Sequence, residues 1–214
     1  MKLLKPLILA SQSPRRITLL RQIGLRPEVV PCDVPEEFSP DLTAAENARV
    51  LAIRKAECVA GRYEDAIVLG ADTIVAIDGC LLGKPVDADD ARRMLRQLSG
   101  ASHTVYTGYA LLERPTGLSV VGVEATTVTF RDLPSDEIEE YVRSGSPMDK
   151  AGAYGIQDDY GAVFVSRVEG CFYNVVGLPL SRVYLALQQL QTTLTETHGK
   201  QDSSAGREGG ARRP

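Results

Sequence analysis

Residues 7–16 place hydroxyl groups and two adjacent cations at the point where an apolar strand is expected to lead into a helix. Ser13 suits the N-cap of that helix, and a proline follows at the first helical position. A helix start already carries unpaired N–H groups and a partial positive charge, so Arg15 and Arg16 there each cost about 0.3–1 kcal/mol unless an anion binds. Together with Ser11, they predict a phosphate or polyphosphate site.

The alternative is a surface helix whose arginines simply face water. Arg16, however, shares a stripe with Leu19, Leu20 and Ile23 at the spacing i, i+3, i+4, i+7, which places Arg16 on the inward face. We therefore favour the anion site.

Lys55 is a second residue that breaks a local rule. In a helix expected over 44–60 it falls near the middle of the apolar stripe, where a cation needs a partner. Its stem could cover apolar surface while the ammonium reaches water. The sharper interpretation is a phosphate in a pocket, to which Lys84, after a predicted hairpin, would add another cation.

Asp72 is the third, because it lies in the centre of a segment, 66–77, with the composition of a buried strand. A buried carboxylate without compensation is costly, so a divalent metal, a lysine or a catalytic water is expected beside it. Gly70 would allow a ligand to approach the backbone. The alternative is a strand break at Gly70, with Asp72 capping a turn.

The glycine-bearing loop 145–157 ends in Gln157, whose amide offers one donor and one acceptor side by side. That pattern matches the O4 and N3–H edge of uracil or thymine, although a flipped amide would suit cytosine, and a nearby arginine would distinguish the two. His103 is expected to be structural, because no nucleophile, base and orienting group can be assembled around it. Hydrolysis by a Ser-His-Asp triad is therefore disfavoured.

The elements that must position these residues alternate between strands and helices, which predicts an α/β or α+β fold with a mixed sheet. Strands are expected at 7–10, 28–31, 66–77, 80–83, 104–113, 119–130 and 162–168, and helices at 14–23, 44–60, 88–98, 135–145 and 180–194. We expect one domain over residues 1–195 and a disordered polar tail over 196–214, since the tail is too polar to offset its ordering entropy.

Composition narrows the class of protein. The chain has 214 residues, 43% of them hydrophobic, and a net charge of −4, which disfavours a nucleic-acid binder because such proteins usually present a basic face. There is no apolar run of about 18 residues and no signal-peptide pattern, so we expect a cytoplasmic protein that does not contact membranes. The four cysteines, Cys32, Cys58, Cys80 and Cys171, are widely spaced and are expected to be reduced.

Seven motifs occur in order along the chain, at 9–16, 55–56, 70–73, 83–85, 103–108, 149–157 and 174–179. Jointly they resemble the Maf family of nucleoside triphosphate pyrophosphatases over about residues 6–190. The sequences Ser-Pro-Arg-Arg, Gly-Ala-Asp-Thr and Gly-Ile-Gln resemble its dTTP/UTP pyrophosphatase branch in particular.

The resemblance implies a Maf/ITPase-like fold, in which a mixed twisted sheet with flanking helices forms two lobes around a central cleft. It also implies a divalent cation (Mg²⁺, Mn²⁺ or Co²⁺) and a homodimer. Carried over by motif, the proton acceptor would be Asp72, the residues that set base preference would be Arg15, Thr73 and Gln157, and those that hold the triphosphate would be Ser11, Ser13, Arg16, Lys55 and Lys84. An acidic residue after the second strand, Glu36 or its neighbours Asp33 and Glu37, would join Asp72 at the metal.

The function expected from this resemblance is hydrolysis of dTTP and UTP, or of modified uridine triphosphates, to the monophosphate and pyrophosphate, which would clear the nucleotide pool. Asp72 would deprotonate water for in-line attack at the α phosphorus, with the metal bridging carboxylate and phosphate oxygens. The alternative is a non-catalytic nucleotide-binding regulator, for example of cell division, which would use the same phosphate cradle.

Overall fold

The computed structural model describes residues 2–157 and 160–205. Its strands are β1 (Leu7–Ala10), β2 (Glu28–Val29), β3 (Ala66–Ile77), β4 (Cys80–Leu82), β5 (Ser102–Arg114), β6 (Ser119–Phe130) and β7 (Val165–Glu169). Its α-helices are α1 (Pro14–Gln22), α2 (Ala44–Ala60), α3 (Ala88–Leu98), α4 (Ser135–Arg143), α5 (Phe172–Val176) and α6 (Leu180–Ala205), and three 3₁₀ helices are η1 (Ser146–Asp149), η2 (Ala151–Ala153) and η3 (Tyr160–Phe164).

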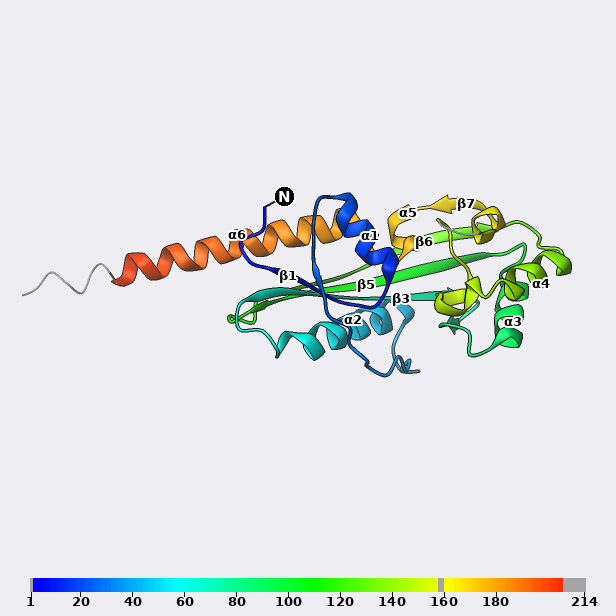
Figure 1. Ribbon diagram of the computed structural model, residues 1–214, viewed down its shortest axis with the longest axis horizontal. Coiled ribbons are helices and arrows are strands. Elements are labelled where there is room, and N and C mark those ends of the chain that lie inside the picture. The colour runs from blue at the N-terminus through cyan, green and yellow to red at the C-terminus, as the bar shows by residue number, and fades with distance from the viewer. Residues whose placement is uncertain (1, 158–159, 206–214) are drawn as a thin grey trace, which may run out of the picture.

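Within the described residues the strands form one mixed, seven-stranded sheet in the order β2-β1-β3-β5-β6-β7, with β4 paired to β3. β1 is parallel to β2 and β3, and the other pairs are antiparallel. α2 covers one face of the sheet, while α1 and α6 cover the other (Figure 1). The expected mixed sheet with flanking helices is confirmed.

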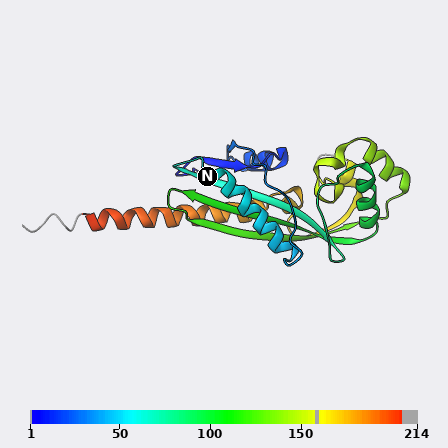
Figure 2. The same cartoon turned by 90° about the horizontal axis from the view of Figure 1, so that it is seen from below.

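Successive side chains along each strand point to opposite faces of the sheet, because a β-strand repeats every two residues. Ile8 and Val68 pack with the alanines of α2, whereas their neighbours Leu9 and Leu69 pack against α1 and α6. A separate core lies at the far end of β3, β5 and β6, beneath α3 and α4 (Figure 2). The cores on the two faces of the sheet belong to one of the two expected lobes, and the core beneath α3 and α4 belongs to the other.

Two glycines let α2 lie unusually close to the sheet. A Cβ at Gly70 would come within 2.2 Å of the Ala52 carbonyl oxygen, and one at Gly108 within 2.2 Å of the Ala48 carbonyl oxygen. The expectation that Gly70 admits a ligand is therefore wrong, because a helix backbone occupies that space. The strand-break alternative is also wrong, since β3 runs unbroken from Ala66 to Ile77.

The expected elements differ from the observed ones mainly at their ends. β2 is shorter than predicted, and β7 begins at Val165 because η3 takes up the preceding residues. α6 continues to Ala205 rather than ending near Leu194, so residues 196–205, predicted to be disordered, are helical, and 206–214 lie outside the described residues. The last part of α6 extends beyond the rest of the described chain (Figures 1 and 2). No described helix is long and apolar enough to span a bilayer.

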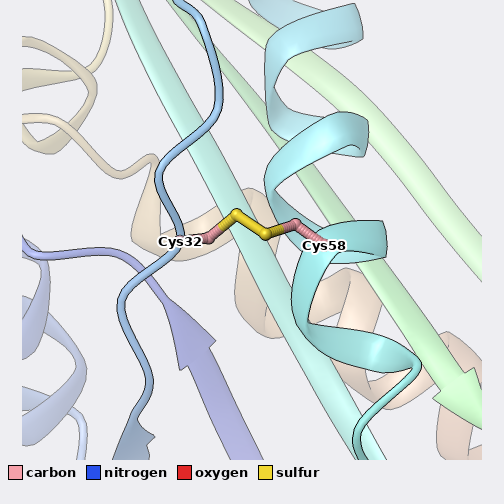
Figure 3. Close-up of a disulfide and its surroundings, with 2 residues drawn as sticks. All are labelled: Cys32 and Cys58. Carbon is pink, nitrogen blue, oxygen red and sulfur yellow. A yellow bond between two sulfur atoms is a disulfide. The ribbon is translucent and has the colours of Figure 1, made fainter.

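The expectation of four reduced cysteines is wrong for two of them. Cys32 and Cys58 form a disulfide with a Cα–Cα distance of 6.3 Å, which joins the loop after β2 to α2 (Figure 3). They are 26 residues apart in sequence, and only the packing of that loop across α2 brings them together. Cys80 and Cys171 are free.

Candidate active site

The site is built on a gap along one edge of β3. β1 pairs with β3 only as far as Ala10 opposite Gly70, and β4 begins to pair at Val75. Between these points, at 71–74, no strand of the described chain pairs with this edge of β3. Asp72 and Thr73 lie in the gap, and because they are adjacent on a strand their side chains point to opposite faces of the sheet.

A cleft of about 860 Å³ opens over this gap, with walls from both lobes. Its volume lies in the range typical of sites for small organic ligands. Every site residue proposed from the sequence lines it: Ser11, Ser13, Arg15, Arg16, Glu36, Lys55, Asp72, Thr73, Lys84 and Gln157. Of the two other acidic candidates, Asp33 lines the cleft, whereas Glu37 is not among its lining residues.

The Lys55 ammonium connects two carboxylates at the α2 side of the cleft. Its Nζ lies 2.5 Å from Asp72 Oδ1 and 2.6 Å from Glu36 Oε1, and its side chain is only 9% exposed. The partner of Lys55 within the chain is therefore a pair of carboxylates. The lysine was one of the three groups expected to compensate Asp72, and it lies beside that carboxylate.

Burial and charge act differently on the two carboxylates. Burial raises the pKa of Asp72 above its usual value, although Lys55 and Arg16 oppose this. Burial also acts to raise the pKa of Glu36, but the charges and hydrogen bonds of Lys55 and Lys84 outweigh it and lower that pKa to about 2. Asp72 is thus the stronger base of the pair, and Glu36 the more permanent anion.

Arg16 lies on the inward face of α1, as its spacing predicts, and is 7% exposed. Its guanidinium donates to Ser11 Oγ at 3.0 Å, to Thr73 Oγ1 at 3.1 Å and to the Gly177 carbonyl at 2.8 Å. Ser13 occupies the N-cap position of α1, but its side chain makes no capping hydrogen bond, and its own N–H is bonded to Ser11 Oγ. The Ser11 hydroxyl therefore contacts the start of the helix, and Ser13 lines the cleft.

Three further ion pairs lie around the cleft. Arg15 Nη1 lies 2.9 Å from Asp149 Oδ2, which links α1 to η1, and Lys150 contacts the same carboxylate at 2.7 Å. Lys84 Nζ lies 3.0 Å from Glu36 Oε2. All of the cations predicted to hold a triphosphate thus surround one opening, each already beside a carboxylate or hydroxyl oxygen.

The sequence patterns did not identify the buried polar side chains that lie beneath the cleft. Thr107 and Asn174 are fully buried and connect to Thr73 through hydrogen bonds. His103, expected to be structural, is buried, and its Nε2 lies 2.8 Å from the hydroxyl of Tyr154, which lines the cleft. Burial lowers the pKa of His103 to about 4. His103 therefore stays neutral and supports Tyr154.

The donor set suits a hard divalent cation only in part. Among the described residues, no group of three or more His, Cys, Asp or Glu side chains could hold a metal ion. Asp72 and Glu36 nevertheless meet at one ammonium, and Mg²⁺ usually binds through one or two carboxylates together with phosphate oxygens of its substrate. The residues fit a cation whose coordination a bound phosphate would complete.

The chain is similar to known proteins over most of its length. A family model described as "Maf-like protein" matches residues 6–190. A dTTP/UTP pyrophosphatase of Pelotomaculum thermopropionicum is 49% identical over 180 residues, covering 84% of this chain and 94% of the relative. One of Salinibacter ruber is 49% identical over 191 residues, covering 89% and 94%. A crystal structure of protein VC0702 from Vibrio cholerae aligns at 11% identity with a TM-score of 0.37, covering 84% of this chain and 95% of that one.

Proposed function

Because the chain belongs to the Maf family, we propose that it is a dTTP/UTP pyrophosphatase, which hydrolyses these nucleotides to the monophosphate and pyrophosphate. The observation that carries the proposal is the convergence of Arg16, Lys55 and Lys84 on one carboxylate-bearing gap in the sheet. The names of relatives that share almost half of the sequence give the nucleotide class.

In the proposed mechanism Asp72 orients a water molecule and takes its proton as the water attacks the α phosphorus. A carboxylate whose pKa is raised by burial is a better base than one in water, which suits this role. The cations around the cleft stabilise the charge that develops on the departing pyrophosphate, so catalysis depends mainly on position and electrostatics.

We propose that Asp72 and Glu36 hold a divalent cation, Mg²⁺, Mn²⁺ or Co²⁺, together with the phosphates. Such a cation would supply positive charge at the phosphate oxygens. When the nucleotide binds, Lys55 would exchange one of its carboxylate contacts for a phosphate oxygen.

Base preference is assigned to Arg15, Thr73 and Gln157, which also line the cleft. Gln157 can donate to O4 at the O4 and N3–H edge of uracil or thymine, and Arg15, which only donates, would favour O4 over the amino group of cytosine. Selection by hydrogen bonds of this kind is strong, because the wrong base leaves a polar group unpaired.

We further propose that residues 1–195 form the catalytic domain and that the protein acts as a cytoplasmic homodimer.

The test is pyrophosphate release from dTTP, UTP, CTP and GTP, with Mg²⁺, Mn²⁺ or Co²⁺ and with a chelator. We expect release from dTTP and UTP that depends on the metal. Nucleotide binding without release under any of these metals would instead identify a non-catalytic regulator.

A further inference from the structure

Three polar side chains beneath the cleft floor have no part in the mechanism above. Thr107 and Asn174 are 0% exposed and Thr126 is 1% exposed, on β5, α5 and β6 respectively. Burying polar groups is costly unless each finds a hydrogen-bond partner. Their partners form a connected chain that ends at Thr73, on the floor of the cleft.

The direction of the bonds in this chain can be derived from elementary chemistry. Thr107 Oγ1 lies 3.0 Å from the main-chain carbonyl oxygen of Asn174, which can only accept a hydrogen bond. A hydroxyl has only one proton to donate. Thr107 therefore donates to Asn174 and must accept from Thr73, whose Oγ1 is also 3.0 Å away. The opposite assignment would leave two acceptor oxygens in contact with no proton between them.

Arg16 uses a second position on the same hydroxyl. Its Nη2 donates to Thr73 Oγ1 at 3.1 Å, which occupies one of the two lone pairs of that oxygen. With its proton directed inward to Thr107, Thr73 has a single lone pair left for the cleft. Toward a ligand, the Thr73 hydroxyl is thus an acceptor and not a donor.

The acceptor at the inner end of the chain is itself fixed. Asn174 Nδ2 donates to the Val105 carbonyl and to Thr126 Oγ1, both at 2.9 Å. Thr126 in turn donates to the Cys171 carbonyl at 3.2 Å and accepts from the Cys171 N–H at 3.1 Å. These hydrogen bonds connect α5 to β5 and β6, so the main-chain carbonyl of Asn174 cannot easily turn away from Thr107.

We propose that Thr107 is a positioning residue which sets the direction of the Thr73 hydroxyl, so that Thr73 accepts a hydrogen bond from the N3–H of uracil or thymine and rejects cytosine. N3 carries a proton in uracil and thymine but is an acceptor in cytosine, so a hydroxyl locked as an acceptor separates the two. This rests on the proposed function and adds the means of its pyrimidine selectivity.

The test is the ratio of kcat/KM for UTP to that for CTP in Thr107→Val. Valine keeps the shape of threonine but cannot accept, so Thr73 becomes free to turn its proton toward a cytosine. We expect the ratio to fall about tenfold, the value of one hydrogen bond, mainly through KM for CTP, with kcat for UTP little changed. Thr107→Ser restores the acceptor and should restore the ratio. Thr104→Val, the same change on the opposite face of β5, serves as the matched control.

A double-mutant cycle keeps the test decisive if valine destabilises the fold. Thr73→Val should also lower the ratio, and adding Thr107→Val to it should change the ratio no further, since Thr107 acts only through Thr73. A wild-type protein that releases no pyrophosphate from UTP or dTTP contradicts the proposed function. A wild-type enzyme that hydrolyses UTP but accepts CTP equally well, or a Thr107→Val variant with the wild-type ratio, overturns this inference alone.

Discussion

The two faces of β3 at the sheet gap differ in the kind of interaction they use. On the α2 face, Lys55 connects Asp72 and Glu36 through short ionic contacts. On the α1 and α5 face, Thr73 and Thr107 form a chain of neutral hydroxyls, with Arg16 as its one charged member. Ionic contacts change with pH and with the charge of the ligand, whereas hydroxyl chains have direction but no net charge. Adjacent residues of one strand can therefore serve reaction and recognition separately.

The largest expected effect tests the ionic face directly. Asp72→Asn keeps the size of the side chain but removes the base, so turnover of UTP should fall about 10³-fold while nucleotide binding persists. Pyrophosphate release and calorimetric binding of a non-hydrolysable analogue measure the two quantities. The UTP to CTP ratio of any residual activity should stay at its wild-type value. Near-normal turnover would show that Asp72 is not the base.

A second substitution asks how much stability the ionic face supplies. Lys55→Met leaves the buried Asp72 without its nearest cation, which should lower the free energy of unfolding by about 3 kcal/mol. Lys84→Met is the matched control, because Lys84 contacts Glu36 too but is 53% exposed, and its loss should cost less than about 1 kcal/mol. Urea unfolding of both variants measures the difference. Equal losses would mean that the Lys55 contacts are screened as surface ion pairs are.

The smallest effect concerns pH. The pKa of Glu36 is about 2 in the folded protein against a usual 4.5, so its ionised form stabilises the fold above pH 4.5, and this stabilisation is lost as the pH falls toward 2. Since the Glu36 side chain is 38% exposed, we expect only about 1 kcal/mol after solvent screening.

Glu36→Gln should remove that part of the acid-induced loss of stability, and Glu37→Gln, next to it in the chain, should not. Urea unfolding at pH 6 and at pH 3 measures both. A loss that is unchanged in Glu36→Gln would assign it to other carboxylates.

The sequence could predict the ionic face better than the neutral one, for a physical reason. A charge inside an apolar pattern, such as Asp72 in a buried strand or Lys55 in an apolar stripe, is costly and therefore visible. Thr107 gives no such signal, because threonine is common in strands whatever it contacts. The assembly around Lys55 could not be predicted either, since it depends on how the loop after β2 crosses α2.

Other predictions were wrong where tertiary packing overrode the local preference of the sequence. The Cys32–Cys58 pair depends on the same crossing loop. The polar end of α6 reads as unstructured by composition, yet it continues a helix that has already formed against the sheet, and adding a turn is far easier than starting one. The roles given to the cleft residues remain predictions, although their gathering at one opening was expected from the sequence.

The sheet gap separates two requirements that often conflict in proteins, namely a stable backbone framework and side chains that can be changed to suit a ligand. Its width is decided by where β1 stops and β4 starts, that is, by backbone pairing, and not by the side chains that line it. Residues at the opening can therefore be exchanged without breaking a ladder bond between strands. A library that varies only the base-recognition residues Arg15, Thr73 and Gln157 should retain the folded scaffold. This opening is therefore a practical place to redirect the chain toward other nucleotides.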